Sequence, residues 1–277
     1  MDSDGAGPQA PEPHKNHDVY FVPGLGRGLL LLETLADARR PLNVTEIAKR
    51  MGLTRSAVFR LAYTLRYMGF IEEVPASKSF TLGPRVLNIG YAFLASKDII
   101  EVSRGDLELL RDVTNVSAHL AIRDRTEVLY LSCVQTRSGF LSNLNVGTRL
   151  PAYATPIGWL LLSELSPQEI RGLLAETPLE TLTELSPRTV AEVIQRIAEV
   201  AARGYAISRG VVEPGGSTIA APIFDRQGRI VAAIDISGPD TAFDTSEIEG
   251  RYVHEVMAAA ERISTRLGHA PRRAAAD

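Results

Sequence analysis

Residues 43–69 predict two helices joined by a very short turn, and no other feature of the chain limits its fold as strongly. Gly52 is a typical helix end, because glycine adopts the left-handed conformation there at little cost. Thr54 follows after a single residue and is a good N-cap for a second helix. A turn this short is typical of a helix-turn-helix. The apolar residues of the first helix recur at i, i+3, i+4 and i+7: Val44, Ile47, Ala48 and Met51.

The second helix of this pair has an apolar face and a polar face. Gly69 ends it, and the expected buried side consists of Val58, Leu61, Ala62, Leu65 and Met68. The other side carries arginines, whose forked donors suit guanine edges and phosphates, and short hydroxyls, which suit phosphates at a helix N-terminus. We therefore expect contacts with double-stranded DNA from the following residues of the two helices and of the hairpin that follows them: Thr45, Thr54, Arg55, Ser56, Phe59, Arg60, Tyr63 and Lys78.

A β-hairpin is predicted directly after the second helix. Two β-prone segments, residues 70–73 and 79–82, flank a turn that contains Pro75 and Lys78. A hairpin in this position is a wing, and Lys78 near its tip can meet a phosphate. A leucine-rich helix from Gly26 to about residue 39 precedes the pair, so the unit consists of three helices and a wing.

Charge is distributed unevenly along the chain. The whole sequence has a net charge of −3, but residues 1–97 carry +3 and residues 98–277 carry −6. Residues 39–69 alone carry +6. A basic segment beside an acidic body suggests a polyanion-binding head. A solvated basic helix face, or a winged module that binds protein, is the alternative.

The second half of the chain alternates helices and strands. Helices are predicted at 99–115, 156–165, 187–203 and 246–267, and strands at 117–123, 128–134, 140–146, 217–224 and 229–237. Helices that flank a mostly antiparallel sheet give an α+β fold of sensory type. The expected division is a disordered tail at 1–18, a winged helix-turn-helix domain at 19–85, a linker helix at 86–98, an effector-binding and oligomerisation domain at 99–270, and a second tail at 271–277.

Several classes of protein are excluded or disfavoured. The longest aliphatic run, Leu29–Leu32, is far too short to span a membrane. Cys133 is the only cysteine, so an intrachain disulfide is impossible and a reducing, cytoplasmic location is expected. The residues 24–28 are rich in glycine but lack the G-K-[ST] ending of a phosphate loop, and we expect a flexible entry to the first helix.

The search for an enzyme finds little. The five histidines form no metal-binding spacing, and no G-x-S-x-G elbow occurs, so we expect no catalytic residue, metal or cofactor. His119 is interpreted as a core or pocket histidine. Two alternatives stay open: a metabolite-binding enzyme with an incidental winged domain, and a redox sensor that uses the Cys133 thiol.

Motifs in both halves of the chain resemble the IclR-type transcriptional regulators, over about residues 22–267. In the head these are Arg27-Gly28-Leu29, Thr45-Glu46-Ile47-Ala48, residues 53–61, Gly69-Phe70-Ile71 and Phe80-Thr81-Leu82-Gly83. In the second half they are residues 146–155, Arg203-Gly204-Tyr205-Ala206, Glu213, residues 219–223 and residues 231–238. The resemblance implies a GAF-like α/β effector domain, and dimers or dimers of dimers that bind pseudo-palindromic operators. It further implies control of a catabolic operon, usually by repression and in some branches by activation.

The resemblance also implies which residues contact a carboxylic or aromatic effector. They are Pro156, Ile157, Ser208, Thr218, Asp235 and Ser237, with Asn143 and Asn145 as additional polar candidates. Asp235 stands where a small hydroxyl or amide residue is common in the family, and Ser208 where an acid is common. An ionised Asp235 would repel a carboxylate. We therefore expect an effector that offers a hydroxyl or amine to Asp235, unless that side chain is protonated, turns outward or is purely structural.

Overall fold

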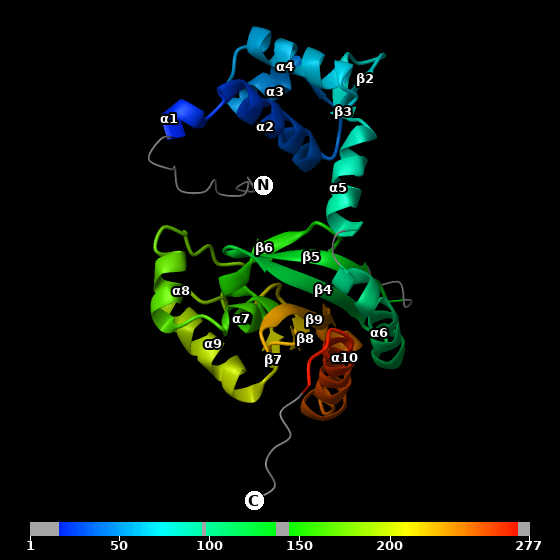
Figure 1. Ribbon diagram of the computed structural model, residues 1–277, viewed down its shortest axis with the longest axis vertical. Coiled ribbons are helices and arrows are strands. Elements are labelled where there is room, and N and C mark those ends of the chain that lie inside the picture. The colour runs from blue at the N-terminus through cyan, green and yellow to red at the C-terminus, as the bar shows by residue number, and fades with distance from the viewer. Residues whose placement is uncertain (1–16, 96–97, 137–143, 271–277) are drawn as a thin grey trace, which may run out of the picture. The chain divides into compact units, whose positions relative to one another are not determined.

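The computed structural model describes residues 17–95, 98–136 and 144–270 (Figure 1). The chain divides into two compact units, Met1–Ser96 and Lys97–Asp277. Asn143 and most of the two predicted tails lie outside the described residues. Within the described ranges, no helix combines the length and the apolar character that a bilayer crossing requires.

The first unit is a winged helix-turn-helix. Its helices are α1 (His17–Tyr20), α2 (Pro23–Ala38), α3 (Val44–Met51), α4 (Arg55–Tyr67) and α5 (Arg85–Ala95), and its strands are β1 (Leu42–Asn43), β2 (Ile71–Val74) and β3 (Ser79–Leu82). The strands form an antiparallel sheet in the order β1-β3-β2, so β2 and β3 make the predicted hairpin. Apolar side chains from α2, α3, α4 and the wing meet in one core, which includes Leu31, Leu35, Ile47, Val58, Ala62 and Phe80.

Two details of this unit differ from the sequence-based expectation. Residues 24–28 are not a flexible entry, because α2 already begins at Pro23. Proline at the first helical position presets the helical φ angle, and this outweighs the low helix propensity of the glycines that follow. Met68 is exposed instead of buried, because it caps the C-terminal end of α4, where the apolar face has left the core.

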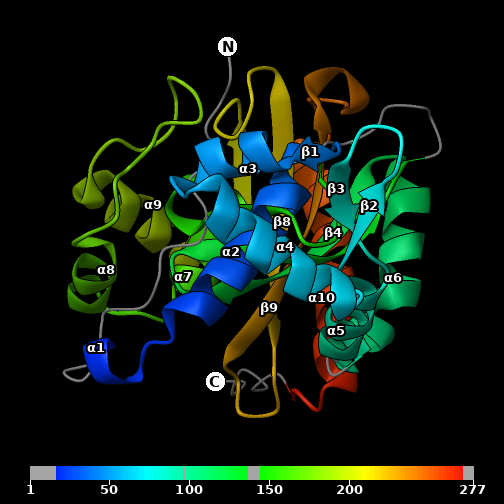
Figure 2. The ribbon, with the colours of Figure 1, turned by 90° about the horizontal axis from the view of Figure 1, so that it is seen from above.

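The second unit is built on a six-stranded antiparallel sheet with the order β6-β5-β4-β9-β8-β7. The strands are β4 (Ser117–Asp124), β5 (Glu127–Val134), β6 (Arg149–Pro151), β7 (Ala206–Arg209), β8 (Gly216–Phe224) and β9 (Ile230–Pro239). The helices are α6 (Asp98–Thr114), α7 (Pro156–Leu162), α8 (Pro167–Leu174), α9 (Val190–Arg203) and α10 (Val253–Arg266), with short turns η1 (Ala152–Ala154), η2 (Asp240–Ala242) and η3 (Ile248–Tyr252). Figure 2 shows α7, α8 and α9 on one side of the strands and α6 and α10 on the other. The predicted α+β class is therefore confirmed.

The two strands at the opposite edges of the sheet, β6 and β7, were not predicted. Residues 144–146, the described part of the strand expected at 140–146, form no strand, and the edge strand β6 comes after them. The short strand β7 has no counterpart among the predictions. The long helix expected from residue 187 begins at Val190, because the hydroxyl of Thr189 caps it by accepting from the Glu192 backbone N–H at 3.2 Å.

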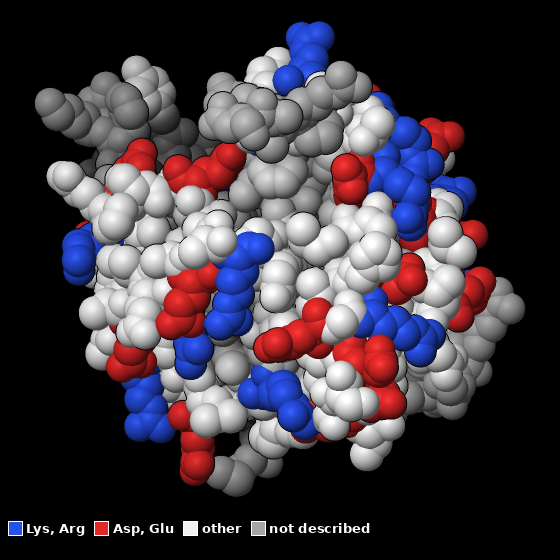
Figure 3. All heavy atoms as spheres, turned by 90° about the horizontal axis from the view of Figure 1, so that it is seen from below, with Lys and Arg blue, Asp and Glu red and all other residues white. Residues whose placement is uncertain are grey.

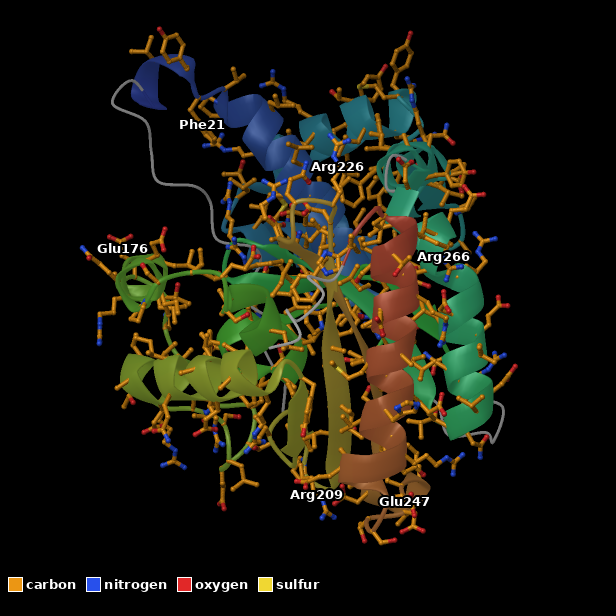
Figure 4. The ribbon with its side chains drawn as sticks, turned by 60° about the horizontal axis from the view of Figure 1, so that its bottom comes forward. Phe21, Glu176, Arg209, Arg226, Glu247 and Arg266 are labelled. Atoms are coloured by element: carbon orange, nitrogen blue, oxygen red, sulfur yellow. The ribbon has the colours of Figure 1, made fainter. Side chains whose placement is uncertain are left out.

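One side-chain contact on each side of the sheet fixes the helices of that side. The indole N–H of Trp159 on α7 donates to the Tyr153 carbonyl at 2.7 Å, which fixes this helix against η1. On the other face, Asp106 of α6 is buried and accepts from Arg262 Nε at 2.7 Å, and it also pairs with Arg266. Figure 4 shows α10 alongside α6, with Arg266 near the C-terminal end of α10.

Candidate functional site

The short turn between α3 and α4 orients α4 so that its outer face is exposed. Gly52 has a φ of 65° and ends α3, as predicted. The hydroxyl of Thr54 accepts from the Ala57 backbone N–H at 3.2 Å, so Thr54 is the N-cap of α4. Its own O–H remains a donor, and a cap and a phosphate contact are therefore compatible at this position.

The outer face of α4 is solvent-exposed and carries both polar and aromatic side chains. Val58 and Ala62 are buried against the core, and Leu61 and Leu65 pack beside them. The residues predicted for DNA contact on this helix are all exposed: Arg55, Ser56, Phe59, Arg60 and Tyr63. Thr45 is exposed on α3. Tyr67, which the site prediction omitted, has 85% of its surface exposed one turn beyond Tyr63.

The wing is tied to α4 by a side-chain ion pair between Arg66 and Glu73. Lys78 is exposed in the turn between β2 and β3, with a φ of 48°. Arg85 donates to the Met68 carbonyl at 2.8 Å and lies over the Phe70 ring at 5.3 Å, which fixes the base of the wing against the end of α4. These contacts hold the wing against α4.

A pocket of about 220 Å³ lies in the second unit, beside β7, β8, β9 and the start of α7. Six of the eight residues predicted for effector contact line it: Pro156, Ile157, Ser208, Thr218, Asp235 and Ser237. Asn145 does not line the pocket. It is the first residue of a turn in which its carbonyl accepts from the Thr148 backbone N–H, and it is exposed. Asn143 lies outside the described residues.

Strand register explains why these polar residues meet. Ser208, Thr218 and Ser237 are direct neighbours across β7, β8 and β9, so they form a row of hydroxyls. The next row contains Ala220 and Asp235. Asp235 thereby joins the row of hydroxyls at the pocket, beside the start of α7.

Asp235 is the charged group at the pocket floor. Only 1% of it is exposed, and its Oδ1 lies 2.7 Å from Nδ1 of His119, which is fully buried on β4. Ser237 Oγ lies 3.4 Å from the same nitrogen. His119 is thus a pocket-floor histidine that holds Asp235, and Asp235 is turned inward.

The negative charge of Asp235 influences two neighbouring acids. Burial, followed by the charges of Asp235 and Cys133 and a hydrogen bond with Asp235, raises the pKa of Tyr130 well above its usual value. Burial and the charge of Asp235 raise the pKa of Cys133 to about 12. Both side chains therefore stay protonated at neutral pH, and Cys133 lacks the thiolate that a reactive sensor cysteine requires. Among the residues that the structure describes, no three His, Cys, Asp or Glu side chains gather as metal ligands.

Comparison with known protein families finds a match for each of the two units. The family described as "IclR helix-turn-helix domain" matches residues 24–75, and "Bacterial transcriptional regulator IclR C-terminal" matches residues 91–265. The chain belongs to the IclR family of transcriptional regulators. This IclR-family protein accordingly has a DNA-binding helix-turn-helix head and an effector-binding C-terminal domain.

Relatives of this IclR-family chain match over nearly its full length. The HTH-type transcriptional regulator BhcR of Paracoccus denitrificans is 32% identical over 260 residues, which cover 94% of this chain and 92% of BhcR. An IclR transcriptional regulator from Alicyclobacillus acidocaldarius is 26% identical, with a TM-score of 0.77 over 90% of this chain and 100% of that one. An IclR homologue from Microbacterium hydrocarbonoxydans, crystallised with 4-hydroxybenzoate, shares the fold at 23% identity, with a TM-score of 0.75 over 88% of this chain and 98% of that one. BhcR and the Alicyclobacillus acidocaldarius protein are both named transcriptional regulators.

The sequence-based reading of this IclR-family protein missed part of the pocket. Tyr130, Thr148 and Ser217 supply further polar lining, and His119 supports Asp235 from behind. The alternation of residues along β5 placed Tyr130 on a strand, but a register shift in β4–β5 between Leu120 and Ala121 determines which neighbours it meets. No local pattern in the sequence reports such a shift.

Proposed function

We propose that α4 enters the major groove of an operator and that Arg55 and Arg60 make its main base or phosphate contacts. The observation that carries this proposal is the exposed outer face of α4, which begins at a capped N-terminus and contains no acidic residue. On the face drawn in Figure 3, by contrast, lysine and arginine side chains alternate with aspartate and glutamate. A basic, rigid helix face is the electrostatic footprint expected for duplex DNA.

The other predicted residues act around this centre. Thr54 and Ser56 contact phosphates at the helix N-terminus, Phe59 and Tyr63 contact groove walls, and Thr45 meets the backbone beside α3. Lys78 contacts a phosphate from the wing. A phosphate contact carries little sequence information, so these residues position the head while the arginines select the site.

The experiment is a gel-shift titration of the full chain on its own promoter fragment at several salt concentrations. Arg60→Ala should lose about 1–3 kcal/mol of operator binding and relax specificity at one base pair. Arg203→Ala, an exposed arginine at the end of α9, is the matched control and should bind like the wild type. Lys78→Ala should weaken binding to all sequences and lower the salt slope by about one. Wild-type protein without a salt-sensitive preference for its promoter would overturn the proposal.

The pocket in the second unit is proposed as the effector site, with Ser208, Thr218, Asp235 and Ser237 as polar contacts and with Pro156 and Ile157 as apolar wall. Its volume of about 220 Å³ is below the range of roughly 300–1,000 Å³ typical of drug-sized ligands, so the effector is a small metabolite. The regulator from Microbacterium hydrocarbonoxydans, crystallised with 4-hydroxybenzoate, supports a ligand of single-ring size. An effector regulates only if it favours one conformation or assembly over another.

Self-association and the sign of regulation complete the proposal. A dimer or dimer of dimers would present two heads to a pseudo-palindromic operator, since protein symmetry matches half-site symmetry. We place the domain boundaries at 19–85, 86–98 and 99–270. Repression of a catabolic operon stays a prediction, which reporter expression with and without this chain would check.

A further inference from the structure

The charge balance of the effector pocket is unusual for a site expected to take a carboxylic metabolite. Among the described residues that line it, Asp235 and Glu213 are acidic, and none is a lysine, arginine or histidine. Asp235 lies in the floor, and Glu213 is an exposed residue at the edge. An anion would therefore meet like charge from these described lining residues, and none of them supplies a cation to offset it.

The contact between Asp235 and His119 fixes the orientation of the carboxyl group at the pocket floor. Nδ1 of His119 faces Asp235, while its Nε2 is buried and has no hydrogen-bond partner among the described residues. A proton on Nε2 would be a buried donor without an acceptor, which is strongly disfavoured. The arrangement therefore favours a ring proton on Nδ1, where it donates to Asp235. His119 thereby orients the Asp235 side chain toward the pocket.

Other groups near Asp235 are donors or neutral. Tyr130 and Cys133 stay protonated, and the adjacent row supplies the hydroxyls of Ser208, Thr218 and Ser237. Hydroxyls can serve as acceptors as well as donors, so they tolerate several ligand groups. Asp235 is the carboxyl group beside this row of hydroxyls, and a carboxylate accepts hydrogen bonds roughly twice as strong as those of a neutral acceptor.

We propose that the effector of this regulator presents a hydrogen-bond donor, an amine or a hydroxyl, to Asp235, and that it is not a simple carboxylate. This inference rests on the proposed effector pocket and replaces the carboxylic class suggested by family resemblance. A protonated amine gains both the hydrogen bond and the charge attraction, whereas an alcohol gains the hydrogen bond alone. A carboxylate gains neither.

Three probes of matched size test this inference: benzylamine, benzyl alcohol and benzoate. Isothermal titration calorimetry on the full chain should rank their affinities in that order, with benzylamine at least about tenfold tighter than benzoate, as expected for a hydrogen bond to a charged group. Asp235→Asn keeps an acceptor for His119 but removes the charge, so it should reduce this preference at least about tenfold. Glu176→Gln removes an exposed carboxylate at the outer end of α8, which Figure 4 shows, and should leave the preference unchanged.

The outcomes separate this inference from the proposed function. Tightest binding of benzoate, an unchanged preference in Asp235→Asn, or no binding of any probe at millimolar concentration would overturn the inference. The wild-type ranking stands even if the variant fails to fold. Gel shifts on the promoter fragment with each probe are read separately: absence of operator binding would refute the proposed function, while calorimetry would still report the chemistry of the pocket.

Discussion

Asn43 and Glu46 cap the helix α3 reciprocally. Asn43 Oδ1 accepts from the backbone N–H of Glu46 at 3.0 Å, and Glu46 Oε2 accepts from the backbone N–H of Asn43 at 2.9 Å. Arg40 donates to the same Glu46 carboxylate at 2.9 Å. The backbone hydrogen bond at Asn43, followed by the hydrogen bond from Arg40, lowers the pKa of Glu46. The short helix that supports α4 therefore begins at a fixed residue.

Removal of this cap should loosen the first half of the helix-turn-helix. Asn43→Ala deletes the acceptor for two backbone N–H groups, and the expected loss is about 1 kcal/mol of local stability. Hydrogen–deuterium exchange of the full chain should become faster in peptides that cover α3. Asn43→Ser retains a capping oxygen and serves as the control. Equal protection in wild type and Asn43→Ala would show that tertiary packing alone fixes the start of α3.

Gly158 should tolerate no side chain. A Cβ at this position would lie 2.2 Å from the Ala152 carbonyl oxygen and 2.6 Å from Thr155 Oγ1, inside the packed start of α7. Gly158→Ala must therefore displace backbone at the pocket wall, and a loss of about 1–3 kcal/mol is expected. Urea unfolding followed by fluorescence of Trp159, the only tryptophan, measures it in the second unit.

A second glycine on a nearby helix provides the control for this measurement. Gly172 lies within α8, and nothing lies within 4 Å of the position of its Cβ. Gly172→Ala should be neutral or stabilising by up to about 1 kcal/mol, because alanine has the higher helix propensity. A Gly158→Ala variant as stable as Gly172→Ala would contradict the close packing at α7.

Removal of the two arginines that pair with Asp106 should destabilise the protein more than replacement of Asp106 itself. Asp106 is buried, whereas Arg262 and Arg266 are each close to half exposed. The double variant Arg262→Ala/Arg266→Ala leaves a buried carboxylate without a cation, so about 1–3 kcal/mol of stability should be lost. Asp106→Asn leaves two hydrated arginines and should lose less, since exposed charges are screened. Urea titrations followed by Trp159 fluorescence measure the stability of both variants. A larger loss in Asp106→Asn than in the double variant would contradict this explanation.

Cys133 should react slowly in the native protein. With a pKa near 12 in place of 9.0, its thiolate fraction at neutral pH falls about a thousandfold. Iodoacetamide should therefore label the folded chain far more slowly than the urea-unfolded chain at the same pH. Rapid native labelling, or a peroxide response of operator binding that Cys133→Ser abolishes, would restore the redox-sensor alternative.

The raised pKa of Cys133 also has a consequence for stability at high pH. The folded state holds the thiol proton more tightly than the unfolded chain, so this contribution is complete below pH 9 and is lost as the pH rises toward 12. Comparison with Cys133→Ser, which has no titrating thiol, isolates the effect. The stability of the wild type relative to this variant should decrease over that pH range in urea titrations, and a constant difference would contradict the assignment.

The head could be predicted from the sequence because its signals are local. The Asn43 cap, the Gly52 stop and the Thr54 cap lie within twelve residues, and each acts on its own helix end. The pocket depends on contacts that join distant residues. His119 and Asp235 are 116 positions apart, and only the pairing of β4 with β9 brings them together. Periodicity places a residue on a strand, but it does not specify which strand lies beside it or where a bulge shifts the register.

The family resemblance identified most of the pocket without supplying its chemistry. Ser208, Thr218 and Ser237 were carried over by motif, and the structure brings them into one row. The role of His119 was not predicted, because it follows from a side-chain contact with Asp235 on a distant strand. Asn145 shows the opposite limit: it was expected as an additional polar contact, but it does not line the pocket.

The antiparallel pairing of β4 with β9 restricts how such a binding site can evolve. A slip of one residue would send His119 and Asp235 to opposite faces of the sheet and exchange every inward side chain for an outward one. A change of ligand that preserves the fold therefore requires substitution of side chains at these positions and no shift of the strands. The backbone register stays the same, and only the side chains on it vary.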